Sequence, residues 1–418
     1  MNVKKSLCIV VVSAALFASA PAQARDMILT PAQSWSGFYA GVHGGFLRAD
    51  QEVVIDTSPT LLVTPDSTFA GLQIGYWAPL SYNWLYGFEA DISFASSDTD
   101  AATGARTQFD RFGTARTRVG YANGPWLLFA SGGLAWSRIS INDITTTFTP
   151  INTKQAFVGW SAGLGVEYAL SPRWSARAEY LFVDLGSNAE SFFGLAVNPD
   201  ISFSAVRLGL NYRLGHLPDS SPRMAQRRGA FNWSGAYTGV HGAYAAGEQA
   251  MEYTFTVPFE TKGGLGGVQG GFNWQFASNI VVGIESDLSF GKIDGTFDAG
   301  CCTVKIEKFG TVRLRAGYAF DNVLIYGTGG VAWAKTDNQY FFSFIASDRP
   351  FLGWTAGVGI EYALSPLWSV KGEYLRVNFG TTRTEYVGLV TFEEKAEYDM
   401  FRIGLNYRAS LFDMLARR

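Results

Sequence analysis

In VGWSAGLGVEYAL, residues 158–170, large apolar residues alternate with small or polar ones through all thirteen positions. A period of two is the pattern of a β-strand with one apolar face. Strands of globular proteins are mostly ~5 or 6 residues long, so a segment of this length favours a strand that crosses a membrane. The apolar face carries Val158, Trp160, Ala162, Leu164, Val166, Tyr168 and Leu170.

The same pattern occurs again at residues 352–364, and it belongs to a repeat that covers most of the chain. WSGFYAGVHGGF from Trp35 recurs as WSGAYTGVHGAY from Trp233, and VRLGLNYR from Val206 returns as FRIGLNYR from Phe401. Repeats at a fixed offset indicate duplicated structural units. We therefore expect one copy at residues 34–214, a periplasmic linker at 215–232, a second copy at 233–409 and a short tail at 410–418.

Residues 1–24 have the pattern of a secretory signal peptide: Lys4 and Lys5 precede an apolar stretch, and Ala22-Gln23-Ala24 forms a small-x-small cleavage site. No other stretch approaches 18 consecutive apolar residues, which excludes a transmembrane helix. Charged residues make up only 17% of the 418 residues, and Gly reaches 47. An exported chain of this composition is either a soluble β protein or an outer-membrane β-barrel.

Each copy is predicted to contain eight strands whose connections alternate between short and long. In the first copy the expected strands are 38–48, 68–78, 86–96, 109–122, 126–141, 156–170, 174–185 and 202–214. Short periplasmic turns opposite long extracellular loops are typical of an up-and-down outer-membrane barrel. The predicted fold class is all-β, a transmembrane antiparallel up-and-down β-barrel.

Aromatic residues on the apolar face are spaced as a membrane requires. Trp160 and Tyr168 are eight residues apart, about 26 Å along a strand. With a strand tilt of ~40° this projects to roughly 20 Å, close to the ~25 Å apolar band between aromatic girdles. The predicted membrane-girdle aromatics are Trp160, Tyr168, Trp174, Phe182, Trp354, Tyr362 and Trp368.

The opposite face is predicted to line the lumen with charges that recur in both copies. Around the tight turns, Glu167 falls opposite Arg177, and Glu361 falls opposite Lys371. Inside a narrow barrel such charges would fill the space and satisfy one another, so we interpret them as a structural plug, with an ion path as the alternative. The predicted network comprises Glu89, Asp91, Arg116, Arg118, Glu167, Arg177, Glu179, Arg207, Glu285, Asp287, Arg313, Arg315, Glu361, Lys371, Glu373 and Arg402.

The opening WSGFYAGVHGGF, the turn segment VEYALSPRW and the closing RLGLNYR resemble a known family. They are similar to small outer-membrane β-barrel proteins of the OmpA-like and opacity type, particularly the immunogenic major outer-membrane proteins of alphaproteobacteria. The resemblance implies the cell outer membrane as location, a role in membrane integrity and solute diffusion, and no catalytic set. The family usually has one barrel and ends on an aromatic residue, whereas this chain has two copies and continues for ten residues from Ala409.

The last strand of each copy also resembles the signal that the outer-membrane assembly machinery recognises. The residues that carry this resemblance are Gly209 and Tyr212 in the first copy and Gly404 and Tyr407 in the second. The expected partners are therefore outer-membrane lipid and lipopolysaccharide, the assembly machinery, and host or surface ligands of the long loops. The formal net charge of −3 offers no basic footprint for nucleic acid.

The leading hypothesis for function is a structural or porin-like outer-membrane protein, and the alternative is a surface adhesin. An enzyme is disfavoured, because His43 and His241 are the only plausible bases and no serine motif recurs beside them.

No cofactor or metal is expected. Cys301 and Cys302 are adjacent and lack a metal-ligand spacing, which leaves two loop thiols, a vicinal disulfide or an intermolecular bridge.

Two architectures fit sixteen strands: two tandem eight-stranded barrels, or one sixteen-stranded barrel with a water-filled channel. Each copy keeps its own opening strand, closing strand and lumen charges. We therefore favour the tandem barrels.

Overall fold

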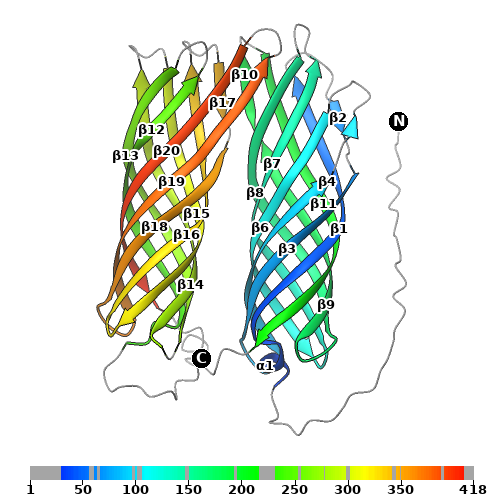
Figure 1. The fold of residues 1–418 in the computed structure, drawn as a ribbon, viewed down its shortest axis with the longest axis vertical. Coiled ribbons are helices and arrows are strands. Elements are labelled where there is room, and N and C mark those ends of the chain that lie inside the picture. Colours follow the sequence, from blue (N-terminus) through cyan, green and yellow to red (C-terminus); the bar gives the residue numbers. More distant parts are fainter. Residues whose placement is uncertain are drawn as a thin grey trace.

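The structure is a computed structural model, and it describes residues 30–408 except for short gaps at 56–60, 64–65, 97–98, 101–105, 146–149, 193–194, 216–230, 253–255, 277, 298–301, 341–344, 349 and 387–389. The expected signal peptide at 1–24, nearly all of the linker at 215–232 and the tail at 410–418 therefore lie outside the described residues. Two β-barrels with tilted strands stand side by side (Figure 1).

The first barrel is made of eight strands, each longer than its sequence pattern predicts. They are β1 (Gly37–Ile55), β3 (Asp66–Pro79), β4 (Trp84–Ser96), β6 (Arg106–Asn123), β7 (Trp126–Thr145), β8 (Pro150–Ala169), β9 (Trp174–Ser187) and β11 (Leu195–Gly215).

The second barrel repeats this arrangement. Its strands are β12 (Gly235–Glu252), β13 (Thr256–Gln275), β14 (Ile280–Phe297), β15 (Cys302–Phe320), β16 (Val323–Tyr340), β18 (Pro350–Ala363), β19 (Trp368–Tyr386) and β20 (Val390–Tyr407).

Each barrel closes on itself through its first and last strands. β1 pairs antiparallel with β11, with Val42 opposite Leu210, and β12 pairs antiparallel with β20, with Val240 opposite Leu405. Within each barrel the remaining neighbours are also antiparallel. The prediction of two closed eight-stranded barrels is confirmed, because a sixteen-stranded barrel would pair β11 with β12 instead.

Short elements lie at the two ends of the barrels. The strands β2 (Leu61–Val63), β5 (Thr99–Asp100), β10 (Ala189–Phe192) and β17 (Ile345–Asp348) belong to the long connections. The helix α1 (Pro31–Trp35) lies at the short-turn end of the first barrel (Figure 1). Thr30 caps it with a capping box, which satisfies free N–H groups of the first turn. Among the described residues no helix is long and apolar enough to span a membrane.

The two barrels contact each other at both ends. At the long-loop end β10 pairs with β17, and the extension of β8 pairs with β19. At the short-turn end, the ring of Trp274 lies 4.7 Å from those of both Phe38 and Tyr76. Aromatic pairs at this separation are worth roughly 0.5–1.5 kcal/mol beyond their buried area. These contacts join the duplicated barrels into a single side-by-side unit.

Candidate functional site

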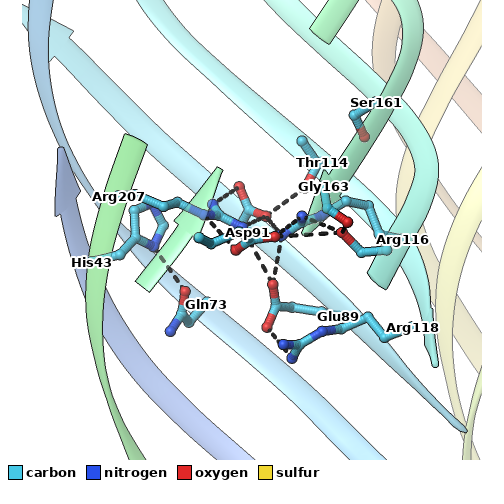
Figure 2. A network of polar contacts seen from close by, with 12 residues as sticks. His43, Gln73, Glu89, Asp91, Thr114, Arg116, Arg118, Ser161, Gly163 and Arg207 are labelled. Atoms are coloured by element: carbon cyan, nitrogen blue, oxygen red, sulfur yellow. Dashed lines mark hydrogen bonds and ion pairs between the residues drawn. The ribbon is translucent and has the colours of Figure 1, made fainter. Parts of the chain in front are cut away.

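A layer of charged side chains crosses the lumen of the first barrel (Figure 2), and within it Glu89 on β4 forms ion pairs with four arginines. Strand alternation sends Glu89 inward, and the neighbouring strand β6 places Arg116 directly opposite it. The carboxylate of Glu89 lies 2.6 Å from Arg116 Nη2 and 2.8 Å from Arg118 Nη1. It also pairs with Arg177 and lies 3.4 Å from Arg207. All four arginines of the layer therefore converge on one carboxylate.

Two further carboxylates complete the pairing. Asp91 lies 3.2 Å from Arg116 and 3.4 Å from Arg207. Glu179 pairs with Arg116 and Arg177, and it accepts a 2.9 Å hydrogen bond from Arg207 Nε. Each of these side chains is fully buried. A buried ion network of this kind is tolerated only because the charges pair and hydrogen-bond with one another.

The second barrel contains an equivalent layer around Glu285. Its carboxylate contacts Arg313 at 2.5 Å, Lys371 at 2.7 Å and Arg315 at 3.4 Å. Asp287 pairs with Arg313 and with Arg402, Glu373 pairs with Arg313, Lys371 and Arg402, and Glu361 pairs with Arg315. Both layers bring together the charges that the sequence places on the inward face.

The predicted charges balance in each barrel. The first contains the carboxylates of Glu89, Asp91, Glu167 and Glu179 against four arginines. The second likewise sets four carboxylates against three arginines and Lys371. A layer without net charge presents neither an anion-selective nor a cation-selective ring, and its members occupy the space that water would need.

The sequence-based pairing of Glu167 with Arg177 and of Glu361 with Lys371 was wrong as a prediction of ion pairs. Both pairs are direct register partners, as expected. However, Arg177 extends across the lumen to Glu89, and Lys371 extends to Glu285. Glu167 instead accepts hydrogen bonds from Ser175 and Asn211. Long cationic side chains in a barrel reach strands on the far wall, which neighbour-only reasoning overlooks.

The lumen is polar only in its middle, which corrects the prediction that the whole inward face is polar. Toward the long loops, Leu181 and Val183 share the inward face of β9 with Glu179 and are at most 1% exposed. In the same region the rings of Phe112 and Phe203 pack 5.1 Å apart. An equivalent apolar cluster fills the second barrel.

Tryptophan side chains close the other end of each charged layer, and no role was predicted for them. Trp35 of α1 is 2% exposed, lies under the guanidinium of Arg213 and donates a hydrogen bond to Gly124 O. Trp233 is fully buried in the second barrel and lies under Arg408. Their shared place in the WSG motif, at the start of each copy, was the signal that could have identified them.

Each of the two histidines contacts a serine in the fold, although no serine motif recurs beside either histidine in the sequence. His43 Nε2 lies 2.8 Å from Ser93 Oγ, and His241 Nε2 lies 2.8 Å from Ser289 Oγ. His43 reaches Ser93 across Gly71, which pairs with both residues and has no side chain to block the path. The repeated pattern Glu-x-Asp-x-Ser, which places Ser93 on the inward face with Glu89, contained this information.

The predicted girdle aromatics lie on the outer face. Trp160, Trp174, Trp354 and Trp368 are each 42–51% exposed, and Tyr168 and Tyr362 are exposed as well. Phe182 is half-buried beside Trp160, with ring centroids 5.4 Å apart. The aromatic residues therefore face the region that lipid occupies around the barrel.

The glycines of the predicted assembly signal face the lumen, beside long cationic side chains. A Cβ on Gly209 would lie 3.2 Å from Arg177, and one on Gly404 would lie 3.2 Å from Lys371. Tyr212 and Tyr407 pack against Trp174 and Trp368 of the preceding strands. These glycines leave room for the cations that extend to the central carboxylates.

Metal ligation has no support among the residues that the structure describes, where no group of three or more His, Cys, Asp or Glu side chains is arranged to hold an ion. Cys301 lies outside the described residues, and Cys302 is the first residue of β15. The two histidine–serine pairs are buried within the charged layers rather than beside an open cleft.

Comparison with known proteins agrees with this architecture. The family model described as the outer membrane protein beta-barrel domain matches twice, over residues 10–213 and 221–408. The 31 kDa outer-membrane immunogenic protein of Brucella melitensis is 34% identical over 202 residues, which is 43% of this chain and 84% of that protein. The 25 kDa outer-membrane immunogenic protein of Brucella abortus is 30% identical over 51% of this chain and all of that protein.

A solved structure is matched over a single barrel. The outer membrane protein OprG from Pseudomonas aeruginosa covers 43% of this chain and 98% of its own, at 14% identity and a TM-score of 0.30. Each relative thus corresponds to about half of the chain, whereas the family model matches both halves. Two closed antiparallel barrels with outward aromatic girdles, matched twice by one family model, show that this chain belongs to the outer membrane protein β-barrel family and is an outer-membrane protein.

Proposed function

We propose that this chain is a structural protein of the outer membrane whose two barrels are sealed rather than open. The observation that carries this proposal is the balanced, fully buried ion network around Glu89, which recurs around Glu285. In each barrel the network lies between a buried tryptophan and an apolar layer. An eight-stranded barrel is just wide enough for side chains to fill its interior.

The lumen contents also argue against solute diffusion as the main role. A water-filled path would need to pass the charged layer and then the apolar cluster of Leu181, Val183, Phe112 and Phe203. Isolated water is poorly stabilised among apolar side chains, because it finds few hydrogen-bond partners there. We infer that the barrels stabilise the membrane through their lipid-facing surface and do not conduct solutes through their lumens.

We further propose that the histidine–serine pairs are structural. His43 and Ser93 are at hydrogen-bond distance, but Ser93 is fully buried and is flanked by the ion network. A nucleophile must reach its substrate, and an oxyanion must find donors around it. Lipid hydrolysis by the purified chain that disappears in a His43→Ala, His241→Ala double variant would contradict this assignment.

A second candidate function is surface binding through the long loops. The strands β7 and β8 are 20 residues long and β11 is 21 residues long, whereas ~9–11 residues suffice to cross the membrane. The excess length extends the long-loop ends of the strands beyond the lipid, and the pairing of β10 with β17 joins the two barrels there. Loops on a rigid scaffold are common binding surfaces, which fits a host or surface ligand.

A strain that lacks this chain should become more sensitive to large hydrophobic antibiotics, because a lipid-facing scaffold has been removed from the membrane. Expression of the full chain should restore resistance, and so should a version with shortened long loops. Unchanged sensitivity in the deletion strain would contradict the structural role. If loop shortening abolishes attachment to host cells while resistance is retained, the second function is carried by the loops.

A further inference from the structure

The outer face of the second barrel contains a groove that crosses β16, β18, β19, β20 and β12. The groove is deep beside Ile403, because its register partners on the two neighbouring strands are Gly372 and Gly242, which have no side chains. A Cβ added at either glycine would meet no atom within 4 Å, and Ile403 is 71% exposed. The groove has a volume of about 940 Å³ and is lined mainly by apolar side chains, including Ile360, Ile325, Val358 and Phe401.

At the end of this groove that is nearer to the long loops, the lining becomes aromatic. Tyr374, Phe401 and Tyr244 are direct neighbours on successive strands. Two of them are tyrosines. The hydroxyl of Tyr374 donates a 2.6 Å hydrogen bond to Asp399, which lies on β20 two residues closer to the long loops than Phe401. Tyrosine between an apolar and a charged surface is typical of the boundary between acyl chains and head groups.

Between these aromatic residues and the long loops, the outward-facing side chains of β19 and β20 are charged. Arg376 pairs with Asp399 at 2.8 Å and with Glu397, while Lys395 lies 3.0 Å from Glu397. These groups surround a second hollow of about 620 Å³ above Ala246 and Ala250. Charged residues on the lipid-facing side of a barrel are costly near the membrane centre and tolerated near its surface.

Only part of the charge on this surface is paired within the protein, where Glu397 contacts Arg376 and Lys395. Glu260, Glu248 and Glu397 are direct register partners on adjacent strands, and directly opposed like charges are destabilising. Lys262 is exposed beside them, on the strand next to Ala246. The surface therefore offers cations for phosphate groups and carboxylates that accept hydrogen bonds from sugar hydroxyls.

The first barrel does not have this charged surface. The repeat places Phe182 where the second barrel has Arg376, and Ser204 where it has Asp399. Ala178 stands in place of Gly372, so the corresponding hollow is partly filled. The two barrels share their lumen chemistry but differ on their outer faces, which provides an internal control.

We propose that the second barrel binds lipopolysaccharide at this outer surface. One acyl chain lies in the groove beside Ile403, and the phosphorylated sugar head group lies on the charged level above it. A phosphate contacts Arg376, Lys262 and Lys395, and sugar hydroxyls donate to Glu248 and Glu260. Only a lipid with acyl chains, phosphate and sugar uses all three chemistries in this order. The proposal depends on the outer-membrane location and not on whether the lumens conduct.

Native mass spectrometry of the purified full chain in detergent, with added lipopolysaccharide of defined composition, tests this site. Arg376→Phe with Asp399→Ser replaces one ion pair of this surface with the residues of the first barrel and leaves the net charge of the surface unchanged. Removal of charge-assisted hydrogen bonds worth ~1.5–3 kcal/mol should weaken binding about tenfold or more. Gly372→Leu with Gly242→Leu should weaken binding by filling the groove.

The matched control is Ala178→Leu, which adds bulk at the corresponding position of the first barrel and should leave binding unchanged. Heat-dependent electrophoretic mobility establishes that each variant is folded. Unchanged lipopolysaccharide binding in both second-barrel variants would overturn the proposal. Equally tight binding of phosphatidylethanolamine would also overturn it, because that lipid has no sugar.

Discussion

Replacement of Glu89 by Ala in the full chain is expected to lower the free energy of unfolding of the first barrel by about 3–5 kcal/mol. Glu89 accepts charge-assisted contacts from Arg116, Arg118, Arg177 and Arg207, and its side chain is fully buried. The substitution leaves four buried cations with only three carboxylates in the layer. Urea unfolding in detergent micelles, followed by tryptophan fluorescence, measures the change.

Asp66→Ala in the same barrel provides the matched control. Asp66 forms a salt bridge with Arg48 at 3.0 Å, but the two side chains are 65% and 69% exposed. Exposed pairs contribute no more than about 1 kcal/mol, so this variant should unfold close to the parent. Glu285→Ala should reproduce the large effect in the second barrel. Equal stability of the Glu89→Ala and Asp66→Ala variants would show that the lumen network does not stabilise the barrel.

Gly159→Val is expected to prevent the first barrel from closing. A Cβ at Gly159 would lie 1.9 Å from the backbone oxygen of Asp184 on β9, and the repeat has the same restriction at Gly353, where Asn378 O would be 2.0 Å away. Backbone atoms of a paired strand cannot move aside as a flexible side chain can, so the cost exceeds the ~1–3 kcal/mol of ordinary overpacking. The variant should lose the fast-migrating, heat-modifiable form on electrophoresis.

Gly372→Ala is the control for this steric prediction. An added Cβ at Gly372 meets no atom within 4 Å, because this glycine faces outward into the groove. The control should fold as the parent does, and the contrast separates steric exclusion from the general loss of a glycine. A Gly159→Val variant that folds with parental mobility would contradict the close packing of β8 on β9.

The sequence predicts much of this fold because barrel strands obey a strict period of two. Trp160 and Tyr168 were placed on the outer face, and Glu89 and Asp91 on the inner face, by alternation alone. The same rule places Leu181 and Val183 inside, beside Glu179, although the lumen was predicted to be polar. Hydropathy and alternation conflict wherever a barrel interior is apolar.

Other features depend on distances across the lumen, which no local pattern contains. Arg177 forms an ion pair with Glu89, which is 88 positions away in the sequence, and not with its register partner Glu167. His43 contacts Ser93 only because Gly71 separates them. Such contacts follow from the diameter and tilt of the closed barrel, and so they require the three-dimensional structure.

The period of two along the strands also does not determine the number of barrels. Eight strands per copy are compatible with either one or two closures, and the outcome is decided by whether the last strand of the first copy pairs with β1 or with β12. The structure pairs it with β1, with Val42 opposite Leu210. Each barrel then has its own charged layer, and the lumen becomes too narrow for a water-filled channel.

Single-channel recording of the purified full chain in a planar lipid bilayer distinguishes two sealed barrels from an open channel. Two sealed eight-stranded barrels, each filled by the networks around Glu89 and Glu285, should give no large and stable conductance steps. Large, stable openings of the kind produced by a sixteen-stranded channel would show that the lumens are open.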